Sequence, residues 1–433
     1  MVKKTILFAL LLGLGWQAQA QIPTPAPPQS QPIVVQGGTI HVGNGQVISN
    51  GSIRFEKGLI TEVGTQVNTT GAKIISAQGK HVYPGIILPD NNLGLHEIGA
   101  VRATLDVREQ GLFNPEARPV VAYNTDSEVI ATLRSNGILL VQIIANGGFM
   151  PGTSSIMELD GWNWEDAVHT MDEGIQMNWL SSYFRRGGGF GGGPETYNAN
   201  RQYQSRMQQI ENTFREARAY AQSKPAKTNL KLEAMKGLFD GSKTLYLQAN
   251  YSKDIVTGVK FAQAQGVKKI VLVGGQDALK VSSFLKENNI PVILARLHRL
   301  PYRTGTDVDL PYKLPYQLKK AGLIVGLSYD RSEPMGARNL PFQAGTAAAY
   351  GLSKEEALQM ITLNNAKILG IDKKVGSLEK GKQATLVVSK GDLLDMLGNK
   401  VEQAFIQGKQ LDLMDKHKYL YQLFKSKYDG NKK

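Results

Sequence analysis

The spacing of apolar and polar positions differs between the middle of the chain and its two ends. Apolar strand-like runs at 268–275, 290–296 and 323–330 are separated by stretches with apolar residues at helical spacing. Continuous apolar strands with helices between them are typical of a parallel sheet with right-handed crossovers. No Gly-x-Gly-x-x-Gly turn follows the first strand, so we expect a (β/α)8 TIM-type barrel over residues 84–370 rather than an open sheet.

At both ends of the chain, apolar and polar residues alternate with the period of two that is typical of half-buried strands. Residues 33–83 include "IVVQGGTIHV" and "GSIRFEKGLITEVG", and residues 371–413 include "ATLVVSKGD", all bounded by glycine or asparagine. Because these stretches flank the predicted barrel, we expect one small composite β-sandwich formed by both ends of the chain. The predicted class is therefore α/β.

Residues 184–225 interrupt the alternation of strands and helices. "FRRGGGFGGGPE" is followed by a polar helical pattern over 198–223. The run lacks the Gly-Lys-Ser/Thr ending of a phosphate-binding loop, which argues against nucleotide binding. A mobile lid beside the barrel mouth and a plain surface insertion are both compatible with this composition.

Residues 1–20 have the three parts of a secretory signal peptide, namely a lysine pair, an apolar run over 6–14 and a small-residue site at 18–20. The apolar run is too short to cross a bilayer, and we expect no transmembrane segment. A Pro-rich spacer over 21–32 should follow, and we expect the mature chain to be exported, periplasmic or secreted. The absence of cysteine excludes disulfides and a thiol nucleophile.

The formal net charge of +13 comes from lysines spread along the chain and from a basic C-terminal tail over 414–433. Basic residues are not interleaved with base-stacking aromatics, so nucleic acid is not an expected partner. A solvated surface, or a weak attraction to anionic envelope surfaces, accounts for this charge.

Three stretches, taken in order, resemble a known family: "NGSIRFEKGLITEVG" at 50–64, "VYPGII" at 82–87 and the long run from "ARNLPFQAGTAAAYG" at 337 to residue 388. The chain resembles the amidohydrolase superfamily, in its imidazolonepropionase-like branch, over nearly its whole mature length. The resemblance implies a barrel with an attached sandwich. It also implies metal-assisted hydrolysis of a carbon–nitrogen bond in a cyclic amide, imide or acylated amine.

The resemblance implies metal ligands that this chain mostly lacks. The family has a His-x-His on strand one, a lysine or glutamate on strand four, histidines on strands five and six, and an aspartate on strand eight. Strand four, expected at 174–179, offers neither lysine nor carboxylate. The aspartate alone is retained, as Asp330. The positions of the lost ligands on strands one, five and six hold Asp90, Asn92, Gln248, Asn250 and Gly274.

Amide oxygens bind zinc-like ions weakly, so no cofactor is expected, although Asp90 and Asp330 leave room for a weakly bound Ca²⁺ or Mg²⁺. His96 and His298 follow strands one and seven and should open on the carboxyl-terminal face of the barrel. With Asp330, either histidine could form a metal-free acid–base site. The alternative is that both are ordinary loop histidines. His169 is expected on a helix face.

Two classes of function follow, and the sequence leaves open whether the protein is an enzyme. The first is the family's hydrolysis of carbon–nitrogen bonds in a small molecule, with a degenerate metal site. The second is a catalytically inactive relative that binds a ligand or pairs with an active homologous subunit. A lesser alternative is a carbohydrate-binding or envelope-anchoring role, which rests on the basic charge and the aromatics of "GWNWED". It would gain weight if the rings of Trp162 and Trp164 were exposed together.

Overall fold

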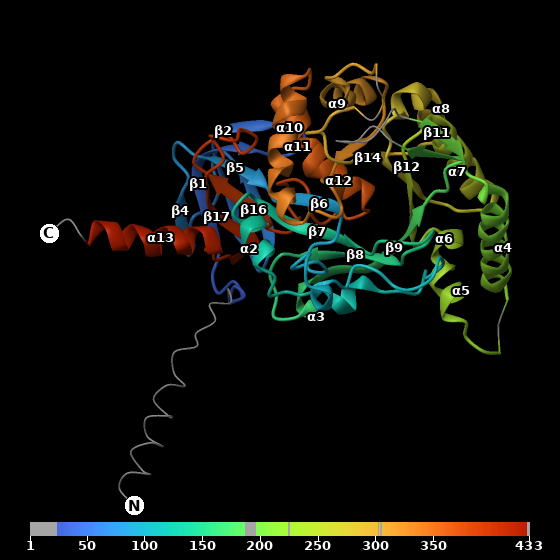
Figure 1. Ribbon diagram of the computed structural model, residues 1–433. Coiled ribbons are helices and arrows are strands. Elements are labelled where there is room, and N and C mark those ends of the chain that lie inside the picture. The colour runs from blue at the N-terminus through green and yellow to red at the C-terminus, as the bar shows by residue number, and fades with distance from the viewer. Residues whose placement is uncertain (1–23, 187–195, 224–225, 302, 304, 431–433) are drawn as a thin grey trace, which may run out of the picture.

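A small β-domain and a helix-covered barrel lie side by side, and the small domain is built from both ends of the chain (Figure 1). The computed structural model describes residues 24–430 apart from 187–195, 224–225, 302 and 304. The expected signal peptide and the glycine-rich run after residue 186 therefore lie outside the described residues.

Eight strands form one nearly closed barrel, as expected from the strand and helix pattern. In spatial order they are β6 (Ile86–Asn91), β7 (Ile138–Ile144), β8 (Thr153–Glu158), β9 (Val168–Asn178), β12 (Thr244–Ala249), β13 (Ile270–Gly274), β14 (Val292–Leu294) and β15 (Val325–Leu327). β8 departs from the expected parallel arrangement because it pairs antiparallel with both β7 and β9. The connection over residues 145–152 is too short for a helical crossover, which takes about a dozen residues.

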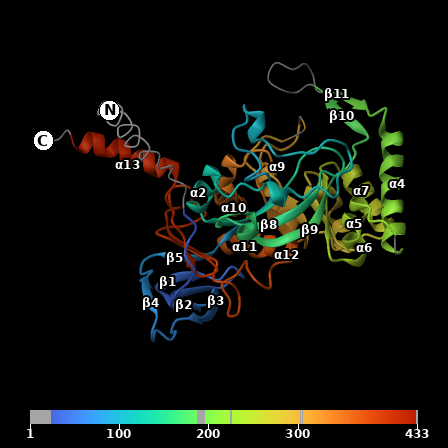
Figure 2. The same ribbon diagram turned by 90° about the horizontal axis from the view of Figure 1, so that it is seen from below.

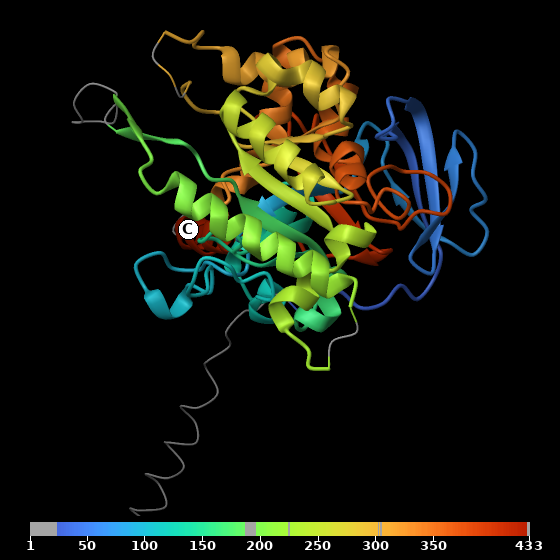
Figure 3. The same ribbon diagram turned by 90° about the vertical axis from the view of Figure 1, so that its right-hand side faces the viewer.

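Helices cover the outside of the barrel, and the longest of them, α4, lies on the side away from the small β-domain (Figure 3). It occupies the stretch where a polar helical segment was expected. A two-stranded hairpin, β10 (Tyr183–Arg186) and β11 (Thr196–Ala199), precedes it. The helices are α2 (Glu128–Arg134), α3 (Trp164–Ala167), α4 (Tyr203–Ala221), α5 (Leu230–Met235), α6 (Gly237–Asp240), α7 (Ser252–Ala264), α8 (Ser282–Glu287), α9 (Leu310–Lys320), α10 (Leu340–Ala349), α11 (Lys354–Ile361), α12 (Leu363–Ile368) and α13 (Lys416–Asp429).

The small domain is built from both ends of the chain, as predicted, and its strands pair in one mixed sheet. Its strands are β1 (Ile33–His41), β2 (Val47–Glu56), β3 (Leu59–Gly64), β4 (Lys73–Ser76), β5 (His81–Pro84), β16 (Leu386–Ser389), β17 (Val401–Ile406) and β18 (Lys409–Gln410). β16 pairs with β5 on one side and β17 on the other, so the two ends of the chain share backbone hydrogen bonds. Phe55 and Phe405 pack edge to face at 5.2 Å between ring centres, which joins the two ends in one core.

One buried side chain bridges the two strands at the ends of the barrel's order, β6 and β15. The Nδ2 atom of Asn365, on α12, donates hydrogen bonds to the carbonyl oxygens of Ile87 at 2.8 Å and Leu327 at 2.9 Å. The side chain is fully buried. Gly326 gives it room, because a Cβ at that position would collide with the Asn365 amide. Asn365 thus supplies the link between strands that backbone pairing supplies elsewhere in the barrel.

The barrel interior contains an ionisable network. Glu173 of β9 accepts hydrogen bonds from Ser154 Oγ at 2.6 Å, Gln142 Nε2 at 2.7 Å and Tyr246 OH at 2.7 Å. The Oε1 atom of Gln142 accepts from the backbone N–H of Asp90 at 3.0 Å, which ties the network to the end of β6. Loss of hydration raises the pKa of Glu173, even though these hydrogen bonds favour its ionised form.

We expect Asn365→Ala to lower the free energy of unfolding by about 2–4 kcal/mol, because two buried carbonyl groups lose their donor. Urea denaturation followed by circular dichroism measures this change. Asn212→Ala, on the outer surface of α4, is the matched control and should change the value by less than about 0.5 kcal/mol. Equal effects of the two substitutions would mean that Asn365 does not hold the barrel closed.

Glu173 should make stability depend on pH. A pKa raised in the folded state means that folding favours the protonated carboxyl group. This contribution is complete below the unfolded pKa of about 4.3 and is lost as pH rises towards the folded value. Wild type should therefore lose stability relative to Glu173→Gln over the range in which pH rises from about 4.3 through the raised pKa, as measured by urea denaturation. A difference between the two proteins that is constant over this range would refute the assignment.

Candidate functional site

The loop after β15 is fastened to the end of β6. Asp90 has a φ of 54°, in the left-handed region that aspartate tolerates, and the pairing of β6 with β7 shifts register just before Asn91. Asn91 Nδ2 donates to the carbonyl oxygen of Asp330 at 3.2 Å, and the backbone N–H of Asn92 donates to the carbonyl of Arg331 at 3.0 Å. The structure therefore brings together the predicted positions on strands one and eight.

The carboxylate of Asp90 binds the guanidinium group of Arg331, a residue that the sequence had not indicated. Nη2 lies 2.5 Å from Asp90 Oδ1, and Nε lies 3.3 Å from Oδ2. Nη1 donates to Asn178 Oδ1, at the end of β9, at 3.2 Å. Only 13% of the Arg331 side chain and 5% of the Asp90 side chain are exposed. A guanidinium group stays charged at physiological pH. The side chain of Arg331 therefore supplies a permanent positive charge at the barrel mouth, where the carboxyl ends of the strands lie.

Buried amide groups lie around this ion pair. Asn178 faces the barrel interior, where it meets Arg331, so strand alternation places Gln176 on the same face. The register pairs Gln248 of β12 with Asn178. Among the described residues, both amide atoms of Gln176 are buried without a partner, as are Gln248 Oε1 and Asn146 Oδ1. Buried polar atoms normally have partners, so these groups indicate a place for a hydrogen-bonding ligand or water.

These side chains do not fit the divalent metal that the resemblance implies. Both oxygens of Asp90 face a guanidinium group, which would repel a second cation. Asn92 donates to the carbonyl of Ile144 at 2.6 Å and accepts from Asn146 at 2.9 Å, so its amide is already engaged. In the described ranges, no group of three or more His, Cys, Asp or Glu side chains is placed to hold an ion. The chemistry available at this mouth is that of amides, a carboxylate and a guanidinium group.

The predicted strand-six position is filled by a neighbour. Gly274 has a φ of 93°, and a Cβ there would lie 2.6 Å from Asn250 Oδ1. A histidine at residue 274 would therefore be strained and would collide with Asn250. Gly274 and Asn250 therefore lie together in the structure, and the Asn250 side chain fills the space that a side chain at residue 274 would need.

The predicted histidines make other contacts than with Asp330. His298 Nε2 lies 2.7 Å from Thr346 Oγ1 of α10, and the His298 ring packs edge to face against Tyr312 of α9. Burial, helped by the charge of Arg296, lowers the pKa of His298, so that its ring is neutral at pH 7. These contacts turn His298 towards the helices outside the barrel.

The other predicted site residues have local partners. Asp330 Oδ1 accepts from the backbone N–H of Ser332 at 3.0 Å. His96 forms an isolated backbone bridge with Leu105 in the loop after β6. No hydrogen bond joins Asp330 to either histidine within the part of the chain that the structure describes. The roles predicted for His96, His298 and Asp330 in catalysis therefore stay predictions.

His169 is on strand β9, so the expectation of a helix face is wrong. Its ring nitrogens lie 2.9 Å from Thr170 Oγ1 and 3.2 Å from Gln383 Oε1. The helix that the polar run suggested is only α3, and the chain enters β9 directly after it. His169 thus joins the barrel to the mixed sheet.

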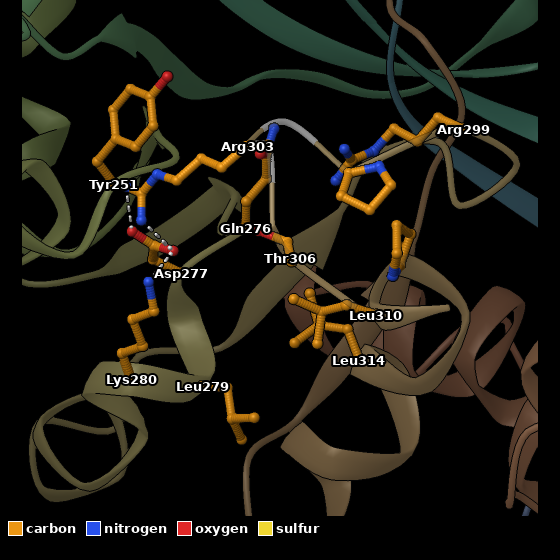
Figure 4. Close-up of a pocket in the computed structure, with 12 residues that line it drawn as sticks. Tyr251, Gln276, Asp277, Leu279, Lys280, Arg299, Arg303, Thr306, Leu310 and Leu314 are labelled. Atoms are coloured by element: carbon orange, nitrogen blue, oxygen red, sulfur yellow. Dashed lines mark hydrogen bonds and ion pairs between the residues drawn. The ribbon is translucent and has the colours of Figure 1, made fainter. Parts of the chain in front are cut away.

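A cavity of about 200 Å³ opens beside the carboxyl ends of β12, β13 and β14 (Figure 4). Asp277 is bound on one side by Arg303 at 2.9 Å and on the other by Lys280 at 3.0 Å. The Arg303 guanidinium lies over the ring of Tyr251, and apolar side chains of α9 form the opposite wall. With Arg299 also in the lining, cations outnumber the one carboxylate, which favours anionic groups.

The condition for a carbohydrate-binding surface is not met. Trp162 is 69% exposed, whereas Trp164 packs partly buried against the barrel core. The two rings therefore do not form one exposed platform.

In the described part of the chain, no helix combines the length and apolarity needed to cross a bilayer.

Comparison with known proteins locates the sequence likeness in limited stretches. Residues 303–411 match the model of the Amidohydrolase family. The imidazolonepropionase of Flavobacterium johnsoniae is 29% identical over 147 residues, which cover 33% of this chain and 33% of that protein. The imidazolonepropionase of Flavobacterium psychrophilum is 30% identical over 112 residues, or 24% of this chain and 27% of that protein. The chain thus aligns with about a third or less of these curated relatives.

Structural likeness extends much further than sequence likeness. The crystal structure of an amidohydrolase from Thermotoga maritima superimposes with a TM-score of 0.76 and covers 88% of this chain and 99% of its own, at 24% identity. That superposition establishes the fold. The family match covers the end of the barrel and the returning sheet strands, and there the chain is similar to the amidohydrolase family in sequence as well as in fold.

Proposed function

We propose that this chain binds a small amide-containing molecule at the barrel mouth without a divalent metal. The observation that carries the proposal is the ion pair between Arg331 and Asp90, which puts a permanent cation of the chain beside a position that the resemblance assigns to a metal ligand. A guanidinium group presents several N–H donors in one plane and suits carbonyl or carboxylate oxygens.

The neighbouring amides define the class of ligand. Gln176 and Gln248 each offer a donor and an acceptor, and their buried unpartnered atoms would gain a partner from a ligand that offers both. Cyclic amides, imides and acylated amines have this pairing of N–H and C=O groups.

Hydrolysis of a carbon–nitrogen bond is the second candidate, and the retained Asp330 favours it. Its carboxylate follows β15 beside the end of β6 and could accept a proton from an attacking water. Arg331 could then stabilise negative charge on the carbonyl oxygen. The family likeness supports this reaction, whereas the loss of the metal ligands favours binding alone.

Export and pairing with an active homologous subunit are proposals of the same kind. The signal-peptide pattern of residues 1–20 supports export to the periplasm or beyond. An inactive relative that keeps an intact barrel would suit a partner subunit, in which the ligand rather than the reaction matters.

The first test replaces Gln176 by methionine, which has a similar shape and no polar amide. Calorimetric titration with hydantoin, glutarimide and N-acetylglutamate should identify a ligand, and Gln176→Met should weaken its affinity about tenfold or more. The same variant should be as stable as wild type or more stable by about 1–2 kcal/mol, because a buried unpartnered amide is removed. A clear loss of stability would mean that the Gln176 amide has partners within the protein. Asn288→Ala, at the C-terminal cap of α8, is the control for binding.

The second test separates binding from hydrolysis. Wild type and Asp330→Asn are incubated with the same three compounds, and ring opening or release of acetate is followed by mass spectrometry. The proposal predicts no turnover by either protein. Turnover by wild type that falls about a hundredfold or more in Asp330→Asn would establish the hydrolase instead.

A further inference from the structure

The C-terminal helix α13 projects away from the rest of the molecule (Figures 1 and 2). None of its residues from Lys416 to Asp429 is buried. Its start is fixed, because Asp415 caps the helix by accepting from the backbone N–H of Lys418 at 2.8 Å and also accepts from Ser135 Oγ at 2.8 Å. The helix therefore leaves the body of the protein from an anchored point and presents all its sides to the outside.

One side of α13 is apolar and uncovered. At 3.6 residues per turn, Leu420, Leu423 and Phe424 lie together, and tyrosines flank them on both sides. The large apolar side chains and their exposed fractions are Tyr419 41%, Leu420 38%, Tyr421 66%, Leu423 51%, Phe424 54% and Tyr428 64%. Isolated exposed apolar residues are ordinary, but six on one projecting helix mark an interaction surface.

The opposite side of the helix is basic and polar. Lys418 and Lys425 lie there with Gln422, and Asp429 is the sole acidic residue of the helix. Tyrosine and phenylalanine on one side and lysine on the other are the composition of helices that lie in the surface of a bilayer. Such helices combine burial of apolar side chains with attraction to anionic lipids.

The positions of two further lysines distinguish a lipid surface from a second protein. Lys416 and Lys427 project on the apolar side, close to Leu420 and Leu423 in the helical projection. Lys416 pairs with Glu128 of α2 at 2.8 Å. Lys427, in a contact between two copies of this helix, would be buried beside other lysines without a carboxylate partner, which is costly. At a bilayer surface their long side chains reach outwards to lipid phosphates while their methylene groups stay with the apolar residues.

We propose that α13 binds the surface of a bilayer that contains anionic phospholipid. Leu420 and Phe424 enter the boundary between headgroups and acyl chains, and the lysines contact phosphate groups. The helix thereby holds the barrel beside the membrane without spanning it. This interaction is independent of what the barrel mouth binds.

Flotation of the mature protein, residues 21–433, with phospholipid vesicles tests the proposal. We expect binding to vesicles of equal parts phosphatidylcholine and phosphatidylglycerol, and much weaker binding to phosphatidylcholine alone. Lys425→Gln with Lys427→Gln should lower the partition coefficient on the anionic vesicles about 30-fold, since two exposed lysines near a charged surface are removed. Leu420→Ser with Phe424→Ser should abolish binding to both kinds of vesicle.

The matched control removes the same charge from another exposed helix, by Arg215→Gln with Arg218→Gln on α4, and should leave partitioning unchanged. Because no residue of α13 is buried, its variants should unfold at the same urea concentration as wild type. Failure of wild type to float with anionic vesicles would overturn the proposal. A dimer in solution that Leu420→Ser with Phe424→Ser dissociates, without any vesicle binding, would assign the helix to a second copy instead.

Discussion

The ion pair between Arg331 and Asp90 is the interaction on which the barrel mouth depends. Two charges that are almost fully buried stabilise each other, and removal of either one would leave the other without compensation. The pair also joins the loop after β15 to the end of β6. Asn365 bridges the same two strands, β6 and β15, through the carbonyl groups of Ile87 and Leu327. Side chains therefore link these two strands at two places.

Near these contacts, the positions that the resemblance assigns to metal ligands are occupied in two different ways. At β6 and β13 the residues there contact their neighbours, as when Asn250 fills the space beside Gly274 or Asn92 bonds to Asn146. At β9 and β12 the replacements leave amide atoms buried without partners among the described residues. The first group stabilises the barrel mouth, and the second leaves hydrogen-bonding atoms that a polar ligand could use. These unpartnered amides, in a barrel whose strands are intact, are the reason for favouring ligand binding over metal chemistry.

Sequence periodicity predicted the barrel because its strands are buried on both sides and read as continuous apolar runs, as 268–275 does for β13. It predicted the joint sheet because both ends of the chain alternate with period two. It missed the direction of β8, since an antiparallel strand buried on both faces has the same apolar pattern as a parallel one. Loop length, over residues 145–152, was the signal that could have shown it.

The site was harder to predict than the fold. The positions of Asp90, Asn92 and Gly274 could be found because they are defined by strand order, but what each contacts could not. Arg331 follows the retained Asp330 directly and looks like any exposed loop arginine, and only the closed barrel brings it to Asp90. His298 shows a second limit, because its loop position could be predicted but the direction of its side chain, towards the outer helices, could not.

The most direct test of this account is the metal content of the mature protein, purified without chelator and dialysed against metal-free buffer. If the Arg331 guanidinium has replaced the metal, mass spectrometry should find far less than one equivalent of any divalent ion, including after incubation with zinc. About one or two equivalents that survive dialysis, and that Asp330→Ala removes, would contradict the account and restore the family's metal chemistry to this barrel.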